Sequence, residues 1–346
     1  MKTGKLPAEL LAQLLARLPS HPRLLLGPGV GRDAAAIDMG GGRVLVAKTD
    51  PVTFATDQIG RYVVHVNAND VACLGARPAW FLATTLLPEG AAPELAEEIF
   101  EQIRSACDEL GVVPVGGHTE ITLGLERPII AGTMLGETTT DALVRPDGVR
   151  AGDHLVLTKG IAVEGTALLA REAPQALRDR GVPERVIDAS ARLLTAPGIS
   201  VVREAMAACA AGQGHVRALH DPTEGGLATA LLELAQAAGL QAHLRLDDVP
   251  VLPETVAVCS ALELDPLGLL ASGALLIAVA PGGCDAVRDA IQDEGITATC
   301  IGAMASGEGD AIIDTRSQRP LPRFERDELA RFLDLQGRAA AGEEAG

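Results

Sequence analysis

Three aspartates near the N-terminus are the residues of this 346-residue chain best suited to chemistry. Asp33, Asp50 and Asp70 each stand beside small or apolar residues, unlike the acidic residues of a solvated surface, which are scattered among Lys, Glu and Ser. Burying a carboxylate among apolar groups costs free energy unless a positive group binds there. Magnesium held by a few carboxylates and by nucleotide phosphates is such a group. These aspartates are therefore predicted to bind Mg²⁺.

The glycines that precede Asp33 suit the binding of a phosphate group. Gly29 and Gly31 belong to the segment 27–37, which reads Gly-Pro-Gly-Val-Gly-Arg-Asp-Ala-Ala-Ala-Ile. A glycine-rich turn lets backbone N–H groups approach phosphate oxygens closely. By itself such a segment is more often an ordinary turn, and it has neither a Walker lysine nor the strand–loop–helix frame of a dinucleotide-binding fold. Asp33 strengthens the functional interpretation, because a metal ligand then lies beside the turn.

The other two aspartates stand in regular elements. Asp50 ends an apolar strand in the run Lys48-Thr49-Asp50, where an ordinary turn is an equally good interpretation. Asp70 follows Asn69 inside a helix that is otherwise largely apolar. Asp and Asn are unfavourable in the middle of a helix. A ligand role is therefore favoured for this pair.

Two later glycine motifs have a similar character. Residues 116–120 (Gly-Gly-His-Thr-Glu) follow an expected strand, and a strand end with small and ionisable residues suits contact with phosphate or substrate. The alternative is a tight turn with an exposed His118. Residues 220–226 (His-Asp-Pro-Thr-Glu-Gly-Gly) allow the same two interpretations, because Asp221 or Thr223 can also cap the next helix.

The composition excludes some partners. The chain carries 29 basic and 46 acidic residues, a net charge of −17, which argues against binding to nucleic acid or to an anionic membrane. Its six cysteines form no C-x-x-C pair, and the N-terminus lacks a signal-peptide apolar core, so reduced thiols and a cytoplasmic location are expected. The uncharged run 266–284 is interrupted by Pro and Gly and is predicted to be a buried turn and strand.

The elements that position these residues are predicted from periodicity. Leucines recur at helical spacing over 7–18, and further helices are expected over 58–75, with Asp57 as its N-cap, and over 93–110. Strands are expected over 43–49, 80–87, 112–115 and 128–136. This order predicts an α+β sandwich in which helices cover one face of a sheet.

A polar turn cluster over 141–153 predicts a boundary between two domains. Beyond it we expect an α/β domain with a strand over 154–158, a helix over 227–238 and a strand–helix–strand unit over 274–303. The charged segment 171–185 is expected to be mobile. The predicted organisation is an N-terminal helix over 1–25, a first domain over 26–145, a second domain over 146–335 and a low-complexity, disordered tail over 336–346.

Taken in order, the motifs resemble the ATP-dependent enzymes related to aminoimidazole ribonucleotide (AIR) synthetase, a PurM-like superfamily. The resemblance covers roughly 26–313 and is closest to its HypE-type hydrogenase-maturation members. It is carried by 31–35 (Gly-Arg-Asp-Ala-Ala), 48–50 (Lys-Thr-Asp), 69–78 (Asn-Asp-Val-Ala-Cys-Leu-Gly-Ala-Arg-Pro), 116–119 (Gly-Gly-His-Thr) and 220–227 (His-Asp-Pro-Thr-Glu-Gly-Gly-Leu).

The resemblance implies a two-domain chain. Its N-terminal domain would bind ATP and dimerise through a ferredoxin-like sheet, and its C-terminal domain would close over the substrate. Magnesium would lie on Asp33, Asp50 and Asp70, and Lys48, His118 and Asp221 are the implied catalytic residues. The implied ATP contacts are Gly29, Gly31, Arg32, Asp33, Thr49, Asn69, Gly116, Gly117 and Thr119.

The chain departs from the family pattern at several positions. Arg32 and His118 each replace an acidic residue, which removes two potential metal ligands, and Lys48 can supply positive charge instead. No cysteine precedes Cys73, although selenophosphate synthetases need an early Cys or selenocysteine. The sequence ends Glu-Glu-Ala-Gly instead of the Pro-Arg-Ile-Cys of HypE, so dehydration of a group carried on a C-terminal cysteine is not expected.

The sequence therefore predicts a cytoplasmic homodimer that uses ATP and Mg²⁺. It would phosphorylate or dehydrate an amide-like, small-molecule or carrier-bound substrate, in a role such as cofactor or metalloenzyme maturation. A small-molecule kinase resembling thiamine-monophosphate kinase is the first alternative. A nucleotide-binding assembly protein without turnover is the second.

Overall fold

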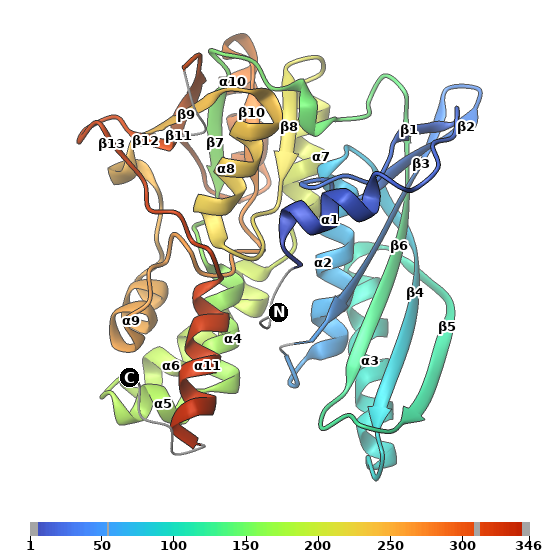
Figure 1. The fold of residues 1–346 in the computed structure, drawn as a ribbon, viewed down its shortest axis with the longest axis vertical. Coiled ribbons are helices and arrows are strands. Elements are labelled where there is room, and N and C mark those ends of the chain that lie inside the picture. The colour runs from blue at the N-terminus through green and yellow to red at the C-terminus, as the bar shows by residue number, and fades with distance from the viewer. Residues whose placement is uncertain (1–5, 54, 308–311, 341–346) are drawn as a thin grey trace.

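The computed structural model describes residues 6–53, 55–307 and 312–340, which form two sheet-containing halves (Figure 1). The first half contains a mixed sheet in the order β1-β2-β3-β6-β4-β5, in which β4 and β5 are parallel. Helices α2 and α3 cover one face of it (Figure 1). Its elements are α1 (Ala8–Leu15), β1 (Leu24–Leu26), β2 (Ala35–Gly40), β3 (Arg43–Val52), α2 (Ile59–Cys73), β4 (Arg77–Pro88), α3 (Pro93–Leu110), β5 (Val113–Thr122) and β6 (Ile129–Thr139). The predicted α+β class is confirmed, but β1 and β2, which flank the glycine-rich turn, were not predicted.

Alternation along β3 decides which of its side chains face the helices. Val44 and Val46 are buried on the inner face of the sheet, which the helices cover. Lys48 and Asp50 therefore lie on this inner face, and Thr49 lies on the outer face. Gly132 of β6 pairs with Asp50 and keeps the inner face open to α2. A Cβ atom at Gly132 would lie 2.6 Å from the Nδ2 atom of Asn67 on α2, so glycine permits the close approach of helix to sheet.

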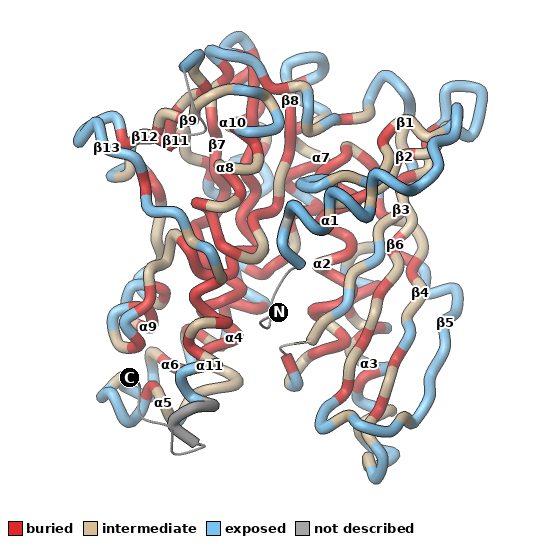
Figure 2. The backbone as a smooth tube through the Cα atoms, viewed as in Figure 1, coloured by how far each residue is buried: buried red, intermediate tan, exposed pale blue. Residues whose placement is uncertain are grey.

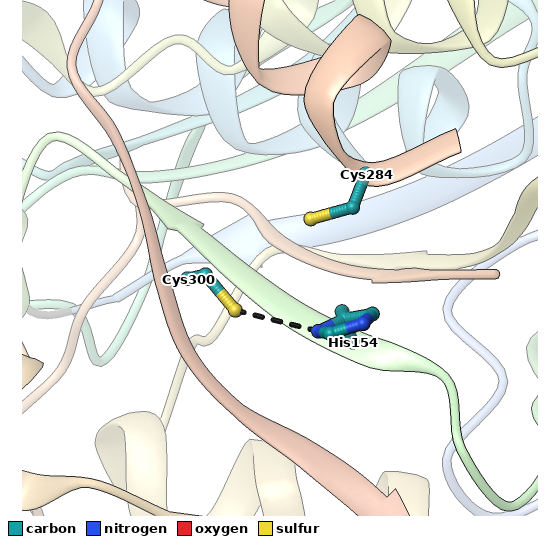
Figure 3. Close-up of side chains that lie close together, drawn as sticks. All are labelled: His154, Cys284 and Cys300. Atoms are coloured by element: carbon teal, nitrogen blue, oxygen red, sulfur yellow. Dashed lines mark hydrogen bonds between the residues drawn. The ribbon is translucent and has the colours of Figure 1, made fainter. Parts of the chain in front are cut away.

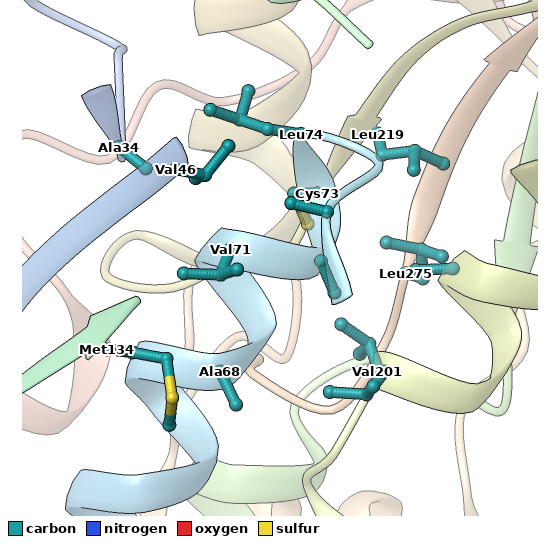
Figure 4. Packing of buried hydrophobic residues seen from close by; sticks show 14 of the residues in the cluster. Ala34, Val46, Ala68, Val71, Cys73, Leu74, Met134, Val201, Leu219 and Leu275 are labelled. Atoms are coloured by element: carbon teal, nitrogen blue, oxygen red, sulfur yellow. The ribbon is translucent and has the colours of Figure 1, made fainter. Parts of the chain in front are cut away.

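Helix α2 lies at the centre of the molecule and is buried along most of its length (Figure 2). On one side Val71 packs with Met134 of the first sheet, and on the other side the helix contacts Val201, Leu219 and Leu275 of the second half (Figure 4). One hydrophobic core therefore continues across both halves, and the polar residues of α2 lie at their junction.

The second half contains a sheet in the order β13-β12-β9-β11-β7-β10-β8. Its strands are β7 (His154–Thr158), β8 (Val216–His220), β9 (Gln241–Leu244), β10 (Leu276–Val279), β11 (Ala298–Ala305), β12 (Ile312–Asp314) and β13 (Arg319–Pro320). Its helices are η1 (Pro146–Gly148), α4 (Val163–Glu172), α5 (Pro174–Asp179), α6 (Glu184–Arg192), η2 (Leu194–Gly198), α7 (Val202–Ala211), α8 (Gly226–Ala238), η3 (Leu246–Asp248), α9 (Pro253–Leu262), η4 (Pro281–Gly283), α10 (Cys284–Asp293) and α11 (Glu328–Ala340). The predicted strand–helix–strand unit is β10, α10 and β11, and β10 is buried as expected.

The charged segment 171–185 lies in a helical region formed by α4, α5 and α6, and its mobility stays a prediction. Two local predictions are wrong. Asp57 does not cap α2: Gln58 precedes the helix without a side-chain cap, and Asp57 is paired with Arg171 at 2.5 Å. Residues 336–340 belong to α11, so the predicted disordered tail does not begin at 336, and 341–346 lie outside the described residues.

One stretch of the described chain, Glu184–Ala211, is long and apolar enough to span a membrane by length and composition alone. Half of the most apolar 18-residue segment of this stretch is buried inside the protein. The stretch is also divided among α6, η2 and α7, with a non-helical residue at Ala196. These features fit core helices of a folded domain.

Strand β5 and helix α1 expose apolar side chains. Strand β5 forms an edge of the first sheet and is exposed along almost its whole length (Figure 2). It carries Val113, Val115 and Ile121 at the surface. The predicted leucine stripe of α1 is also exposed at Leu10 and Leu14, so this helix does not bury its apolar face within the chain.

Candidate active site

A partly buried lysine joins two of the predicted aspartates. The Nζ atom of Lys48 lies 2.7 Å from Oδ2 of Asp70 and 3.3 Å from Oδ2 of Asp50. Asp50 comes from the same face of β3, Asp70 from α2, and Asp33 from the turn between β1 and β2. All four residues line one cleft. The structure thus brings together the three residues that the sequence predicted as metal ligands.

The cluster is rich in negative charge, since Asp50 and Asp70 share the ammonium group of Lys48 and Asp33 adds a third carboxylate. Burial lowers the pKa of Lys48, but Asp70, Asp50 and Asp33 outweigh this effect and hold the pKa above its usual value. Burial raises the pKa of Asp70 to about 7, against the lowering effect of Lys48 and with a further rise from Asp33. A further cation bound nearby would stabilise the charged form of such a carboxylate.

His220 extends this cluster into the second half. Its Nδ1 atom lies 3.3 Å from Oδ2 of Asp33, and its Nε2 atom lies 3.4 Å from Oε2 of Glu233. Burial lowers the pKa of His220, but hydrogen bonds to Asp33 and Glu233 raise it to about 10. The imidazolium therefore holds Asp33 in place. His220 belongs to the predicted motif 220–226, although Asp221 was the residue selected from it.

The cleft that contains the cluster has a volume of about 300 Å³ and lies between the two halves. The second half contributes Glu164, Leu168, Thr223, Glu224, Leu270 and Ser272 to its wall. Glu164 was missed by the sequence analysis. Burial raises its pKa to about 7, although the neighbouring Ser272 hydroxyl lowers it. The signal available in the sequence was a glutamate directly after a loop of small residues, which does not reveal that Glu164 lines the cleft together with Asp50.

The donor set of the cleft fits a hard cation and a phosphate chain. Asp33, Asp50 and Asp70 offer carboxylate oxygens, the ligand type that Mg²⁺ prefers. Lys48 offers a fixed positive charge next to them. The buried hydroxyl of Tyr62, which also lines the cleft, has no hydrogen-bond partner among the described residues. A buried polar atom without a partner indicates a place for a polar ligand.

The second glycine motif lies elsewhere in the same chain. Residues 116–119 are not at a strand end, as predicted, but inside the edge strand β5. Gly117 pairs with Ala83 of β4, Ala83 pairs with Gly132 of β6, and Gly132 pairs with Asp50 of β3. Gly117 is therefore three strands away from Asp50, roughly 14 Å at the usual spacing between strands. His118 is exposed, and its Nε2 atom lies 3.1 Å from Oε2 of Glu120. Within one chain Gly116, Gly117, His118 and Thr119 do not reach the aspartate cluster.

These four residues instead line a separate groove of about 670 Å³ between β5 and α3. Phe100 and Arg104 of α3 form its other wall. Gly117 is required there for a steric reason, because a Cβ atom would lie 1.9 Å from the carbonyl oxygen of Ala83. This explains one glycine of the motif through strand packing.

Three further predicted contacts point away from the cleft. Thr49 lies on the outer face of the sheet, where its hydroxyl donates to the carbonyl of Gly132 at 2.8 Å. Asn69 and Asp221 are buried and hydrogen-bonded to each other at 2.8 Å, so both are occupied in joining the two halves. The geometry gives Asn69 and Asp221 structural positions at the junction of the two halves, and their cofactor-binding and catalytic roles stay predictions.

The glycine-rich turn keeps a position beside the cluster. Gly31 lines a small recess of about 30 Å³ together with Asp33, Asp70 and His220. Gly29 lies against the side chain of Arg32, which is exposed and donates from Nη1 to the carbonyl of Gly27 at 3.3 Å. Arg32 therefore closes its own turn in this structure.

Both halves of the chain match family models. Residues 31–138 match the model described as AIR synthase related protein, N-terminal domain. Residues 150–315 match AIR synthase related protein, C-terminal domain. The first matched segment contains β2 to β5 and nearly all of β6, and the second contains β7 to β12.

The chain is similar to named proteins over most of its length. It is 30% identical over 317 residues to carbamoyl dehydratase HypE of Rhizobium leguminosarum bv. viciae, covering 85% of this chain and 86% of that protein. It is 29% identical over 343 residues to selenide, water dikinase of Paraburkholderia xenovorans (strain LB400), covering 88% and 92%. A crystal structure of E. coli HypE shares the fold, with a TM-score of 0.72 at 24% identity over 94% of this chain and 99% of that one.

Proposed function

The chain belongs to the AIR synthase-related family, and from this premise we propose that it is an ATP- and Mg²⁺-dependent enzyme of the HypE-like type. Its substrate would be an amide-like group, on a small molecule or on a carrier, that is phosphorylated and then dehydrated. The HypE relatives are named carbamoyl dehydratases, and a carbamoyl group is an amide of this kind. The proposal extends that chemistry to this chain.

The observation that carries the proposal is the cluster of Lys48 with Asp33, Asp50 and Asp70 at the cleft between the two halves. The aspartates would hold Mg²⁺, and the turn that contains Gly29 and Gly31 would receive phosphate groups. When bound, Mg²⁺ would neutralise charge on the triphosphate. Phosphoryl transfer requires mainly positioning and charge stabilisation, which this arrangement supplies.

The remaining residues of the cleft suit the activation of an amide. Glu164 has a pKa raised to about 7, so near neutral pH its carboxyl group can accept or donate a proton. The hydroxyl groups of Tyr62, Thr223 and Ser272 line the same cleft and can orient a polar substrate. Leu168 and Leu270 add apolar walls that exclude water.

A kinase that stops at phosphoryl transfer is the second candidate, because a related protein is named selenide, water dikinase. The small-molecule kinase of the thiamine-monophosphate type belongs to the same class of reaction. The two candidates differ in the product: a kinase accumulates a phosphorylated acceptor, whereas a dehydratase loses the phosphate from its acceptor and leaves a dehydrated group. Phosphorus NMR of the reaction mixture separates them.

A homodimer is part of the proposal. Strand β5 exposes apolar side chains at a sheet edge, which is unusual for a surface that stays in water. Pairing of two sheets would cover this surface. It would also bring residues 116–119 of one protomer nearer to the other protomer, which is the one route by which His118 could act as predicted.

The proposed function is tested by replacing a single cluster carboxylate. Calorimetry should detect MgATP binding to the wild-type chain, and Asp70→Asn should weaken binding or lower ATP turnover by at least about 100-fold, as expected when an electrostatic group of a transfer site is removed. Asp141→Asn changes an exposed aspartate outside the cleft and is the matched control. The site assignment would be refuted if the wild type did not bind MgATP. It would also be refuted if Asp70→Asn bound MgATP and turned over ATP as the wild type does.

A further inference from the structure

A second group of potential metal ligands lies outside the cleft. His154 is the first residue of β7, Cys300 lies on the adjacent strand β11, and Cys284 is the first residue of α10 (Figure 3). One ligand atom from each of the three residues lies within 4.8 Å of the other two. The Sγ atom of Cys300 is 3.7 Å from Nδ1 of His154. The proposed ATP chemistry uses none of these side chains.

Tertiary structure alone brings the three residues together. In the β7–β11 pairing, Cys300 is opposite Val156, and Val156 shares a face of β7 with His154. The same face packs against α10, where Val287 and Ile291 join Val156 in one core cluster. The start of α10 therefore lies over the strands, with Cys284 directed toward Cys300 and His154 (Figure 3).

We propose that His154, Cys284 and Cys300 form a zinc site, with a fourth position open to water or to an external ligand. Two thiolates and one imidazole are a common donor set for Zn²⁺. Tetrahedral zinc, with bonds of about 2.3 Å to sulfur and about 2.0–2.1 Å to nitrogen, places neighbouring sulfur and nitrogen ligands about 3.6 Å apart. The distance of 3.7 Å between Cys300 and His154 matches this value.

The surroundings support metal binding over other uses of the two cysteines. Cys284 is buried, whereas Cys300 and His154 are partly exposed, so an ion can enter a site that is largely shielded from water. A disulfide requires the two sulfurs to lie about 2.05 Å apart and gives the imidazole no part. A zinc ion uses all three groups and requires no change in the fold.

The zinc site is separate from the proposed active site. None of the three residues lines the cleft or the recess around the aspartate cluster. His220 of the cluster is level with Leu157 of β7, because both pair with Leu276 of β10, and His154 lies three residues, roughly 10 Å, farther along β7. The zinc ion would tie α10 to the second sheet and stabilise this half of the chain. The inference does not depend on the proposed ATP-dependent reaction.

The test is a zinc titration of the full chain, purified under reducing conditions and stripped with a chelator. Competition with a chromophoric chelator should show one Zn²⁺ held tightly per chain, and Co²⁺ in its place should give the near-ultraviolet absorption of thiolate ligation. Cys300→Ser and His154→Asn should each weaken zinc binding by at least about 100-fold, since even outer-shell partners are worth 10- to 100-fold. Cys209→Ser, a partly buried thiol outside the cluster, should leave affinity unchanged.

Co²⁺ absorption distinguishes this site from adventitious binding at the aspartate cluster, which has no sulfur. Far-ultraviolet circular dichroism of each variant checks that it is folded, and Cys300→Ala provides a second variant if Cys300→Ser is not. Absence of a thiolate band in folded protein would overturn the proposal. An equal loss of affinity in Cys209→Ser would also overturn it, as would a Cys284–Cys300 disulfide in a separate preparation made without reductant that binds no zinc after reduction.

Discussion

Asn69 of α2 donates a hydrogen bond of 2.8 Å from Nδ2 to Oδ2 of Asp221, and this bond joins the two halves of the chain. The Nδ2 group also donates to the carbonyl of Ile199 at 2.8 Å, and Oδ1 accepts from the backbone N–H of Val201 at 2.9 Å. The other oxygen of Asp221 accepts from the N–H of Gly273 at 3.0 Å. Each residue of the pair has a neighbour in the site, since Asp70 follows Asn69 and His220 precedes Asp221. The pair therefore sets the position of one half of the cluster relative to the other.

Replacing Asn69 should destabilise the protein. Asn69→Ala leaves the buried carboxyl of Asp221 without one donor, and an unsatisfied buried polar group costs about 1–3 kcal/mol. Burial already holds the pKa of Asp221 well above its usual value, and the hydrogen bond from Asn69 is one of the interactions that oppose this effect. Urea unfolding measures the change. Gln175→Ala, which removes an exposed amide on α5, is the control and should have little effect. Equal stability of Asn69→Ala and wild type would contradict the assigned linkage.

Glu164 should make stability depend on pH. Its pKa in the folded protein is raised to about 7 from an ordinary value of 4.5, mainly by burial. The folded state therefore binds more protons than the unfolded state between these values, and the free energy of unfolding falls as pH rises through this window. Glu164→Gln should flatten the slope between pH 4.5 and 7. Chemical unfolding across this range measures it, and an unchanged slope in the variant would exclude Glu164 as its source.

The buried ion pair of Lys159 with Glu204 should contribute strongly to folding. The Nζ atom of Lys159 lies 2.8 Å from Oε1 of Glu204, and both side chains are almost fully buried. Glu204→Gln leaves a buried ammonium without its counter-charge, which costs about 3–5 kcal/mol. Urea unfolding tests this, with Glu101→Gln as a control because Glu101 pairs with Arg104 on the exposed surface of α3. A larger effect from the surface substitution would be inconsistent with this interpretation.

A charge on β5 should dissociate the proposed dimer. Ile121 is 65% exposed on this edge strand, so a carboxylate there is tolerated in a monomer but would be buried in a sheet-to-sheet interface. Sedimentation velocity should show a wild-type dimer and a folded Ile121→Asp monomer. Val256→Asp introduces the same charge on α9, at a site 50% exposed and outside the sheet, and should remain dimeric. A monomeric wild type would disprove the dimer.

The sequence by itself was enough to predict the elements whose hydrophobic period is regular. Val44 and Val46 mark the inner face of β3, and the same alternation, continued to Lys48 and Asp50, already places Thr49 on the opposite face. Helix α3 has the predicted bounds, and Gly111 is its left-handed C-cap. Strand β5 continues beyond the strand predicted over 112–115, because pairing with β4 stabilises a stretch whose two glycines have low strand propensity.

Only the tertiary structure decided which side of α2 meets the second half of the chain. Adjacent residues on a helix point about 100° apart, so Asn69 faces Asp221 while Asp70 faces Lys48, and no local pattern assigns these directions. Glu164 and His220 reach the cluster through contacts between residues far apart in sequence, as do the three proposed zinc ligands. The sequence shows which residues can carry out chemistry. Which of them meet in one site depends on packing between distant segments, and local periodicity does not predict that packing.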